Sequence, residues 1–181
     1  MKKKLSLVLL TVLLVSSIVT GVAIAGGWGG SWGVGSLIFN GYFAGLGNND
    51  VDVKLSTTGT VVAICQNKGG NTAPGQNPVT VNITETATWT TADNGRADGS
   101  VETDPPTIAN TPAPSGKDAG CPNNNWTVVG YDASTTNYKT ANLLVTEVGN
   151  PSHVFFNLNF TCVTSFNAAG QHTAVSCTYV P

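Results

Sequence analysis

The chain has 181 residues, of which only 10% are charged, with eight Lys and Arg against ten Asp and Glu and a formal net charge of −2. Three of the basic residues lie within the first four positions, so the chain beyond them carries a net charge of about −5. This balance leaves little positive charge to neutralise phosphates and argues against binding to nucleic acid or to anionic lipid. Hydrophobic residues make up 41% of the chain, which argues against disorder throughout and fits one folded domain.

Residues 1–25 have the pattern of a cleaved secretory signal peptide. Lys2, Lys3 and Lys4 precede the apolar run LSLVLLTVLLVSSIV, and the segment ends in the small-residue box Ala-Ile-Ala at 23–25. The alternative is an uncleaved membrane anchor, but the apolar run is near the short limit for a membrane span. We therefore expect cleavage before Gly26 and a secreted protein, extracellular or at the cell surface, without membrane contact afterwards.

Residues 26–36 (GGWGGSWGVGS) are rich in glycine and carry Trp28 and Trp32. The glycines predict a flexible leader ahead of a single domain at 37–181, whose first strand is expected in SLIFNGYF. Two exposed tryptophans would stack on a sugar ring or dock into a partner, and the alternative is that they fold back onto the domain. The candidate residues for self-association are Trp28, Trp32, Ile38 and Phe39.

Alternation with a period of two predicts β-strands through the rest of the chain. VDVKL (51–55) and TVVAIC (60–65) flank STTG and predict a hairpin, and a strand at 79–90 is expected to pair with a short one at 99–103. Seven or eight short strands separated by turn residues predict an all-β, two-sheet antiparallel sandwich, immunoglobulin-like in strand count only. The remaining strands are expected at 126–133, 140–148, 153–166 and 173–180.

Two segments fall outside this strand pattern. Residues 66–78 (QNKGGNTAPGQNP) read as a loop rich in Asn and Gly, and residues 104–125 contain five prolines. Proline has no amide hydrogen to donate to a strand ladder, so 104–125 is predicted to be an irregular excursion. Loops of this length in a compact domain are usually functional or disordered.

Four cysteines in a secreted chain predict two disulfides, with three possible connectivities. Cys162 and Cys177 lie symmetrically about NAAG (167–170). If NAAG forms a hairpin turn, these two cysteines face each other across the ladder, which leaves Cys65 to pair with Cys121.

The sequence offers little support for catalysis. Only His153 and His172 are available as imidazole bases, and the chain has no GxSxG nucleophile motif. The three glutamates occupy positions typical of solvated strand faces, and no spacing brings two of them across a cleft. We predict no catalytic residues, no cofactor and no enzyme activity.

Calcium is the one metal with a candidate site. The segment DNGRADG places Asp93, Asn94 and Asp98 around two glycines, and Ca²⁺ prefers oxygen ligands of this kind. Asn-Gly and Asp-Gly are also the commonest hairpin-turn pairs, and the turn is the interpretation that we favour.

Three segments resemble those of a group of small secreted bacterial proteins that share a GLGN-x-DV strand, a C-x-N-x-GGN-x-APGQNP loop and a KDAGCPN-x-NW segment. Here the segments are residues 45–51, 65–78 and 117–126, so the resemblance covers residues 43–131. Many of those proteins carry only the two cysteines that correspond to Cys65 and Cys121, which supports that pairing; the second pair departs from the pattern and looks like a local hairpin staple. The resemblance implies a bacterial, secreted identity and no mechanism.

Two functions remain. The first is a non-enzymatic extracellular structural or interaction protein that self-associates by adding an extended strand to a neighbour's sheet. The alternative is a module that binds a glycan or small polar ligand through the Asn-rich loops 66–78 and 121–126. Its candidate ligand-binding residues are Asn67, Asn71, Gln76, Asn77, Asn123, Asn124 and Trp126.

Overall fold

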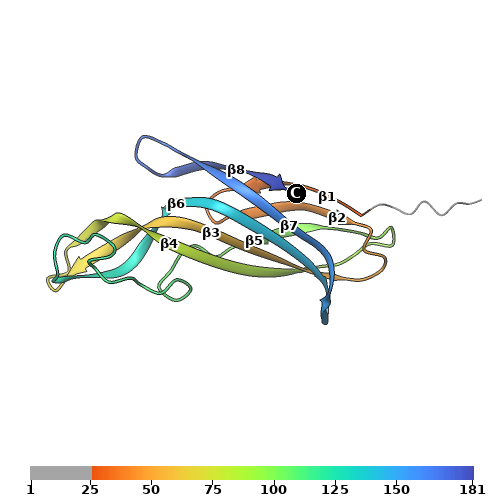
Figure 1. Ribbon diagram of the computed structural model, residues 1–181, viewed down its shortest axis with the longest axis horizontal. Helices are drawn as coiled ribbons and strands as arrows, with labels where there is room; N and C mark the ends of the chain where they lie inside the picture. The colour runs from red at the N-terminus through yellow and green to blue at the C-terminus, as the bar shows by residue number, and fades with distance from the viewer. Residues whose placement is uncertain (1–25) are drawn as a thin grey trace, which may run out of the picture.

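A computed structural model describes residues 26–181, so the predicted signal peptide lies outside the described residues. These residues form eight antiparallel strands in two sheets, which confirms the predicted all-β sandwich (Figure 1). Within 26–181 no helix is long and apolar enough to cross a membrane. The strands are β1 (Gly27–Gly33), β2 (Ile38–Ala44), β3 (Val51–Asn67), β4 (Thr72–Trp89), β5 (Arg96–Glu102), β6 (Trp126–Glu147), β7 (Asn150–Phe166) and β8 (His172–Val180).

The two sheets differ in size. The smaller has the order β1-β2-β5 and the larger β4-β3-β6-β7-β8. The larger sheet extends well beyond the smaller one, because β3, β4, β6 and β7 have 17 to 22 residues whereas β1, β2 and β5 have seven each. The smaller sheet can therefore cover only part of the larger one.

The predicted hairpin within 51–65 is wrong, because β3 runs unbroken through STTG. Gly59, which reads as a turn residue, lies opposite Tyr138 of β6 at a shift in strand register. A Cβ atom at Gly59 would lie 2.6 Å from the carbonyl oxygen of Asn137, so this glycine permits a close approach of two backbones. The predicted strands at 126–133 and 140–148 are likewise one strand, β6, interrupted only by register shifts.

The predicted partner of the short strand at 99–103 is also wrong. This strand, β5, pairs along its length with β2, and its bridge to the chain just before it, between Thr91 and Ala97, is isolated. Gly95 adopts φ +74° in the connecting turn, where the chain passes from the larger sheet to the smaller one. The Asn-Gly pair thus makes a turn, as expected, but between sheets.

The predicted flexible leader is corrected as well: residues 27–33 form β1, which pairs with β2 over its whole length. Glycine content here reflects tight packing of backbone on aromatic rings. A Cβ atom at Gly30 would lie 2.5 Å from the Phe39 ring. The predicted loop 66–78 is also shorter than expected: β3 ends at Asn67 and β4 begins at Thr72, so the turn between them consists of residues 68–71.

The main core lies between the two sheets. Phe39 and Phe43 of β2 pack against Trp89, which is 4% exposed. This core comprises Leu37, Phe39, Phe43, Leu46, Val51, Val53, Leu55, Trp89, Ala97, Val101, Tyr138, Ala141, Leu143, Val145, Leu158, Phe160 and Cys162.

A second core lies beneath the proline-rich excursion, beyond the reach of the smaller sheet. It comprises Val61, Ala63, Val79, Val81, Ile83, Ala119 and Tyr131. Ala119 of the excursion is fully buried there, and the Tyr131 hydroxyl donates to the carbonyl oxygens of Thr111 and Pro112 at 3.2 Å each. Residues 104–125 have no strand, as predicted, and they cover apolar residues of the larger sheet that lie beyond the smaller sheet.

Both disulfides have the connectivity expected from the hairpin argument. Cys65 bonds to Cys121, and Cys162 bonds to Cys177, its register partner across the β7–β8 hairpin. The first ties the excursion to β3 over the second core. Two disulfides are compatible with an extracellular protein.

Candidate functional site

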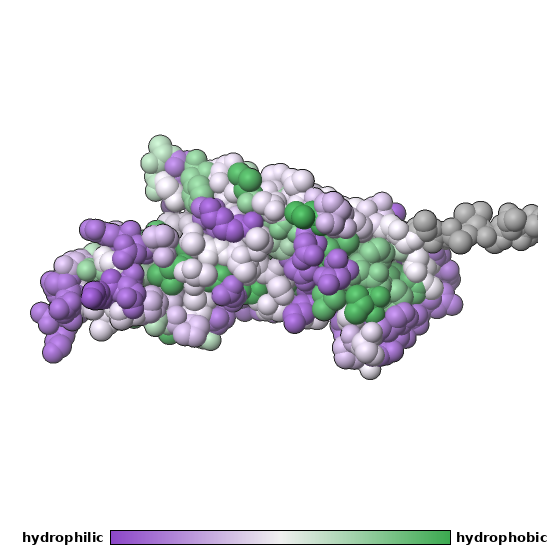
Figure 2. Space-filling model, in the orientation of Figure 1, coloured by the Kyte–Doolittle hydropathy of each residue, from purple (hydrophilic) through white to green (hydrophobic). Residues whose placement is uncertain are grey.

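The Cys65–Cys121 disulfide joins the two Asn-rich loops at one end of the molecule. The Cα atoms of the two cysteines are 5.8 Å apart. Two residues beyond Cys65 on β3, Asn67 lies opposite Trp126 of β6. We call this end, residues 65–72 and 121–126, the stapled tip. Figure 2 shows hydrophilic side chains gathered at that end of the molecule, where β3 turns into β4.

The stapled tip contains a hollow of about 430 Å³ beside the half-buried Trp126. Of the predicted ligand residues, Asn67, Asn123 and Trp126 line it, together with three residues that sequence analysis did not single out: Lys68, Gly69 and Asn125. The only sign of these three residues in the sequence was their position next to predicted ligand residues. Asn71 and Asn124 are exposed at the tip without lining the hollow.

Asparagine side-chain oxygens at the stapled tip accept hydrogen bonds from the backbone of the turns that carry them. The Asn67 side-chain oxygen accepts from the backbone N–H groups of Gly69 at 2.9 Å and Asn71 at 3.0 Å. The Asn123 side-chain oxygen accepts from the N–H of Asn125 at 2.9 Å. These bonds are typical of asparagine in turns, so both side chains stabilise the loops that carry them.

Gln76 and Asn77 hold the excursion rather than joining the hollow. Their backbone N–H groups donate to the carbonyl oxygens of Gly120 and Ala119, and the Asn77 side-chain nitrogen donates to the Asp118 carbonyl at 2.9 Å. The predicted ligand set is therefore divided between the hollow, exposed positions of the tip, and the contact of β4 with the excursion.

The two tryptophans of β1 enter an aromatic slot between the sheets. The Trp28 ring lies 5.3 Å from that of Phe160 and 5.6 Å from that of Tyr179, while the Trp32 ring lies 5.1 Å from Phe39 and 5.0 Å from Phe160. We call these three partners, Phe39, Phe160 and Tyr179, the tryptophan slot. The tryptophans thus fold back onto the domain.

The other two predicted self-association residues also lie within the protein's own sheet. Ile38 is half-buried at the start of β2 and pairs with Gly33, and Phe39 is fully buried. Phe39 is therefore no surface residue in this arrangement, and it contacts another chain only if β1 or β2 is displaced.

The histidines lie apart from each other. His153 Nδ1 lies 2.8 Å from Glu147 Oε2 at the β6–β7 turn, and this hydrogen bond, with a second from Asn150, lowers the pKa of Glu147. His172 begins β8, where its ring stacks near that of Tyr138. His172 Nδ1 lies 3.4 Å from the Thr136 carbonyl oxygen.

The candidate calcium ligands are split between a turn and a strand. Asp93 and Asn94 lie in the turn before β5, where the Asn94 side-chain oxygen accepts from the N–H of Arg96. Asp98 lies on β5 and binds the Arg96 guanidinium at 2.8 Å, which lowers its pKa. Residues 26–181 contain no group of three or more His, Cys, Asp or Glu placed to hold a metal. Calcium binding at these three residues stays the alternative to the turn interpretation that we favour.

No protein-family model, no curated protein and no solved structure matches this chain. Its fold defines its class: a two-sheet antiparallel β-sandwich whose larger sheet is covered by a smaller sheet on one half and by a disulfide-stapled excursion on the other.

Proposed function

We propose that this protein is a secreted, non-enzymatic extracellular structural protein that self-associates by exchanging β1 between copies. The observation that supports it is the way β1 is held: as an edge strand that, among residues 26–181, pairs with β2 alone, with two tryptophan rings in the tryptophan slot.

The composition of β1 favours exchange. Four of its seven residues are glycine, which costs more conformational entropy to order than any other residue, and its only large side chains are the two tryptophans. An edge strand has one sheet neighbour and leaves no gap between two others when it moves. The β1 of another copy makes the same contacts in the same slot, so exchange replaces intramolecular contacts by identical intermolecular ones.

The turn between β1 and β2 supplies the hinge. Only residues 34–37 join the two strands, and Gly35 adopts φ +121° there, a conformation that it can leave for an extended one without steric cost. If this turn opens, β1 points away from its own sheet. Reciprocal exchange then gives a closed dimer, and head-to-tail exchange gives an open fibre.

Extracellular residence is supported by the two disulfides and by the pattern of residues 1–25. A non-enzymatic role is supported by the separation of the two histidines and by their carboxylate and ring partners.

A covalent lock between β1 and β2 tests the exchange. Ser31 and Asn40 are register partners, and both are exposed. The Ser31→Cys/Asn40→Cys variant, oxidised as a monomer, is expected to remain monomeric by light scattering at concentrations at which the wild type associates.

The matched control links β2 to its other neighbour through Asn40→Cys/Ser100→Cys, again a register pair. This control restrains the same sheet but leaves β1 free, so it is expected to associate like the wild type. Association of the Ser31–Asn40 locked protein at the wild-type level would refute exchange of β1.

The stapled tip supports a second candidate function, a module for a glycan or small polar ligand. The hollow beside Trp126 favours it, because half-buried tryptophan with neighbouring amides suits a polar ring. Titration of ligands against Trp126→Phe and wild-type protein tests it: equal affinities would remove Trp126 from the site.

A further inference from the structure

The face of the larger sheet that points away from the core carries two rows of aligned, uncharged residues that cross all five strands. The strand registers place one residue from each strand in each row. We call them the hydroxyl–amide rows: the first is Asn82, Thr58, Thr140, Thr161 and Thr178, and the second is Thr84, Ser56, Asn142, Asn159 and Val180.

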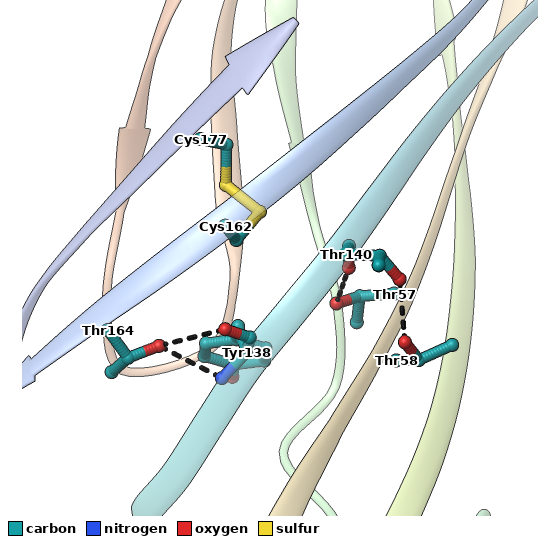
Figure 3. Close-up of a disulfide and its surroundings, with 7 residues drawn as sticks. All are labelled: Thr57, Thr58, Tyr138, Thr140, Cys162, Thr164 and Cys177. Atoms are coloured by element: carbon teal, nitrogen blue, oxygen red, sulfur yellow. Dashed lines mark hydrogen bonds between the residues drawn. A yellow bond between two sulfur atoms is a disulfide. The ribbon is translucent and has the colours of Figure 1, made fainter. Parts of the chain in front are cut away.

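Hydrogen bonds between strands fix the orientation of several of these side chains. The hydroxyl oxygens of Thr58 and Thr140 lie 2.6 Å apart, and Figure 3 shows them beside Thr57, whose hydroxyl donates to the Thr140 carbonyl at 2.7 Å. In the second row the Asn142 side-chain nitrogen donates to the Asn159 side-chain oxygen at 2.9 Å. Polar groups ordered before binding lose less entropy when a ligand arrives.

Other groups in the rows keep free hydrogen-bonding capacity. The side chains of Asn82 and Thr161 make no hydrogen bond to another residue within 26–181, and the Asn159 amide nitrogen donates to none of them. Donors and acceptors therefore face solvent next to groups that are already oriented.

The rows enclose a shallow hollow of about 490 Å³, within the range of small-molecule sites. None of its lining residues is charged; the charged neighbours along the strands are Lys139, next to Thr140 on β6, and Lys54, one row further along β3. A charged ligand would find no counter-charge in the hollow, whereas a neutral polyol finds hydroxyls and amides on every strand. The methyl groups of threonine and Val180 supply apolar contact for the C–H faces of sugar rings.

We propose that the hydroxyl–amide rows bind a neutral glycan chain that lies extended across the strands. Neighbouring strands are about 4.7–4.9 Å apart, a spacing close to the length of one residue in an extended polysaccharide. Successive sugars then meet successive strands, from Asn82 on β4 to Thr178 on β8. The proposal stands apart from β1 exchange, because the rows lie on the opposite face of the larger sheet from the tryptophan slot, and apart from the stapled tip.

Titration calorimetry with chitohexaose and cellohexaose, both neutral, and with acidic hexagalacturonate tests the proposal. At least one neutral hexasaccharide is expected to bind more than tenfold more tightly than the acidic one. Thr58→Val/Thr161→Val removes two hydroxyls while it keeps side-chain volume, and it is expected to weaken that binding more than tenfold.

One control variant is expected to bind like the wild type: Thr86→Val, an equally exposed threonine outside the hollow. Amide chemical shifts of the wild-type protein give an answer that does not depend on any variant's folding. The expected perturbations map to the rows; perturbations confined to residues 67–69 and 123–126, or no binding of either neutral hexasaccharide, would overturn the proposal.

Discussion

Tyr138 offers a quantitative test of how the main core is built. Its side chain is fully buried, and its hydroxyl has no hydrogen-bond partner among the described residues. The polar groups nearby hydrogen-bond to each other: the Leu37 N–H donates to the Thr103 hydroxyl at 3.1 Å, and the Thr103 N–H donates to the Leu37 carbonyl at 3.0 Å. Tyr138→Phe therefore removes a desolvated group and no hydrogen bond.

The magnitude of the effect depends on pH. At pH 7 we expect Tyr138→Phe to leave the free energy of unfolding unchanged or to raise it by up to about 1 kcal/mol, because an unpaired buried hydroxyl is costly. Burial raises the pKa of Tyr138 to about 12. The folded state then holds its proton more tightly than the unfolded state, whose tyrosine has a pKa of about 10, so stability from this group is complete below pH 10 and falls as pH rises towards 12.

Urea unfolding at pH 7 and pH 11 measures both effects. At pH 11 the difference in pKa amounts to about 1.4 kcal/mol of lost stability in the wild type, and this loss should be absent in Tyr138→Phe. Because all other residues are the same in the two proteins, the comparison isolates Tyr138. A variant that is less stable by more than about 1 kcal/mol at pH 7, or that loses as much stability as the wild type at pH 11, would refute an unpaired buried hydroxyl.

Three further predictions concern the sheets and the staples. Gly59→Ala places a Cβ atom against a main-chain oxygen of β6 and should destabilise the protein by about 1–3 kcal/mol in urea unfolding; an unchanged midpoint would show that the strands separate easily there. Replacing Cys65 and Cys121 by serine should lower the free energy of unfolding by about 4 kcal/mol, measured by thermal unfolding, because this disulfide closes a 56-residue separation and holds the excursion over the second core. A smaller loss than on removal of the Cys162–Cys177 disulfide, which closes a separation of 15 residues, would contradict this. The lowered pKa of Glu147 stabilises the folded state above the unfolded pKa, and this stability is lost as pH falls through the folded pKa. Glu147→Gln should therefore make the free energy of unfolding depend less on pH in the acid range. An unchanged pH dependence would show that the hydrogen bond with His153 does not stabilise the protein.

The strand pattern could be predicted from the sequence wherever alternation was the only signal. The symmetry of Cys162 and Cys177 about NAAG predicted a hairpin and a disulfide, and the prolines of 104–125 predicted a segment without strands; both are confirmed. These features depend on local chemistry, namely turn residues and missing amide hydrogens.

Glycine caused most of the wrong predictions, because it occurs both in turns or flexible segments and in paired strands where two backbones pack closely. Gly59 and Gly30 read as signs of a turn and a flexible segment, whereas both permit close packing inside paired strands. The choice between these roles depends on the neighbouring strand. Without strand register, Gly59 in STTG looks the same as a hairpin glycine.

The candidate sites were predictable only in part for the same reason. The pairing of Cys65 with Cys121 brought Asn67 and Trp126 together as expected, but the use of asparagine oxygens within the turns depends on backbone geometry. The hydroxyl–amide rows were missed altogether. In sequence, Thr58 and Asn82 are ordinary polar positions of alternating strands, and only register aligns them across the sheet.

Exchange of β1 is tested most directly by a cross-link that forms only between chains. A copy with Ser31→Cys is mixed with a copy with Asn40→Cys, and the mixture is oxidised after association. Exchange predicts a covalent heterodimer on a non-reducing gel, since β1 of one copy lies on β2 of the other, and it predicts none from Ser31→Cys mixed with Ser100→Cys, whose positions are two strands apart. Associated protein that yields no Ser31–Asn40 cross-link between chains would contradict the proposed function.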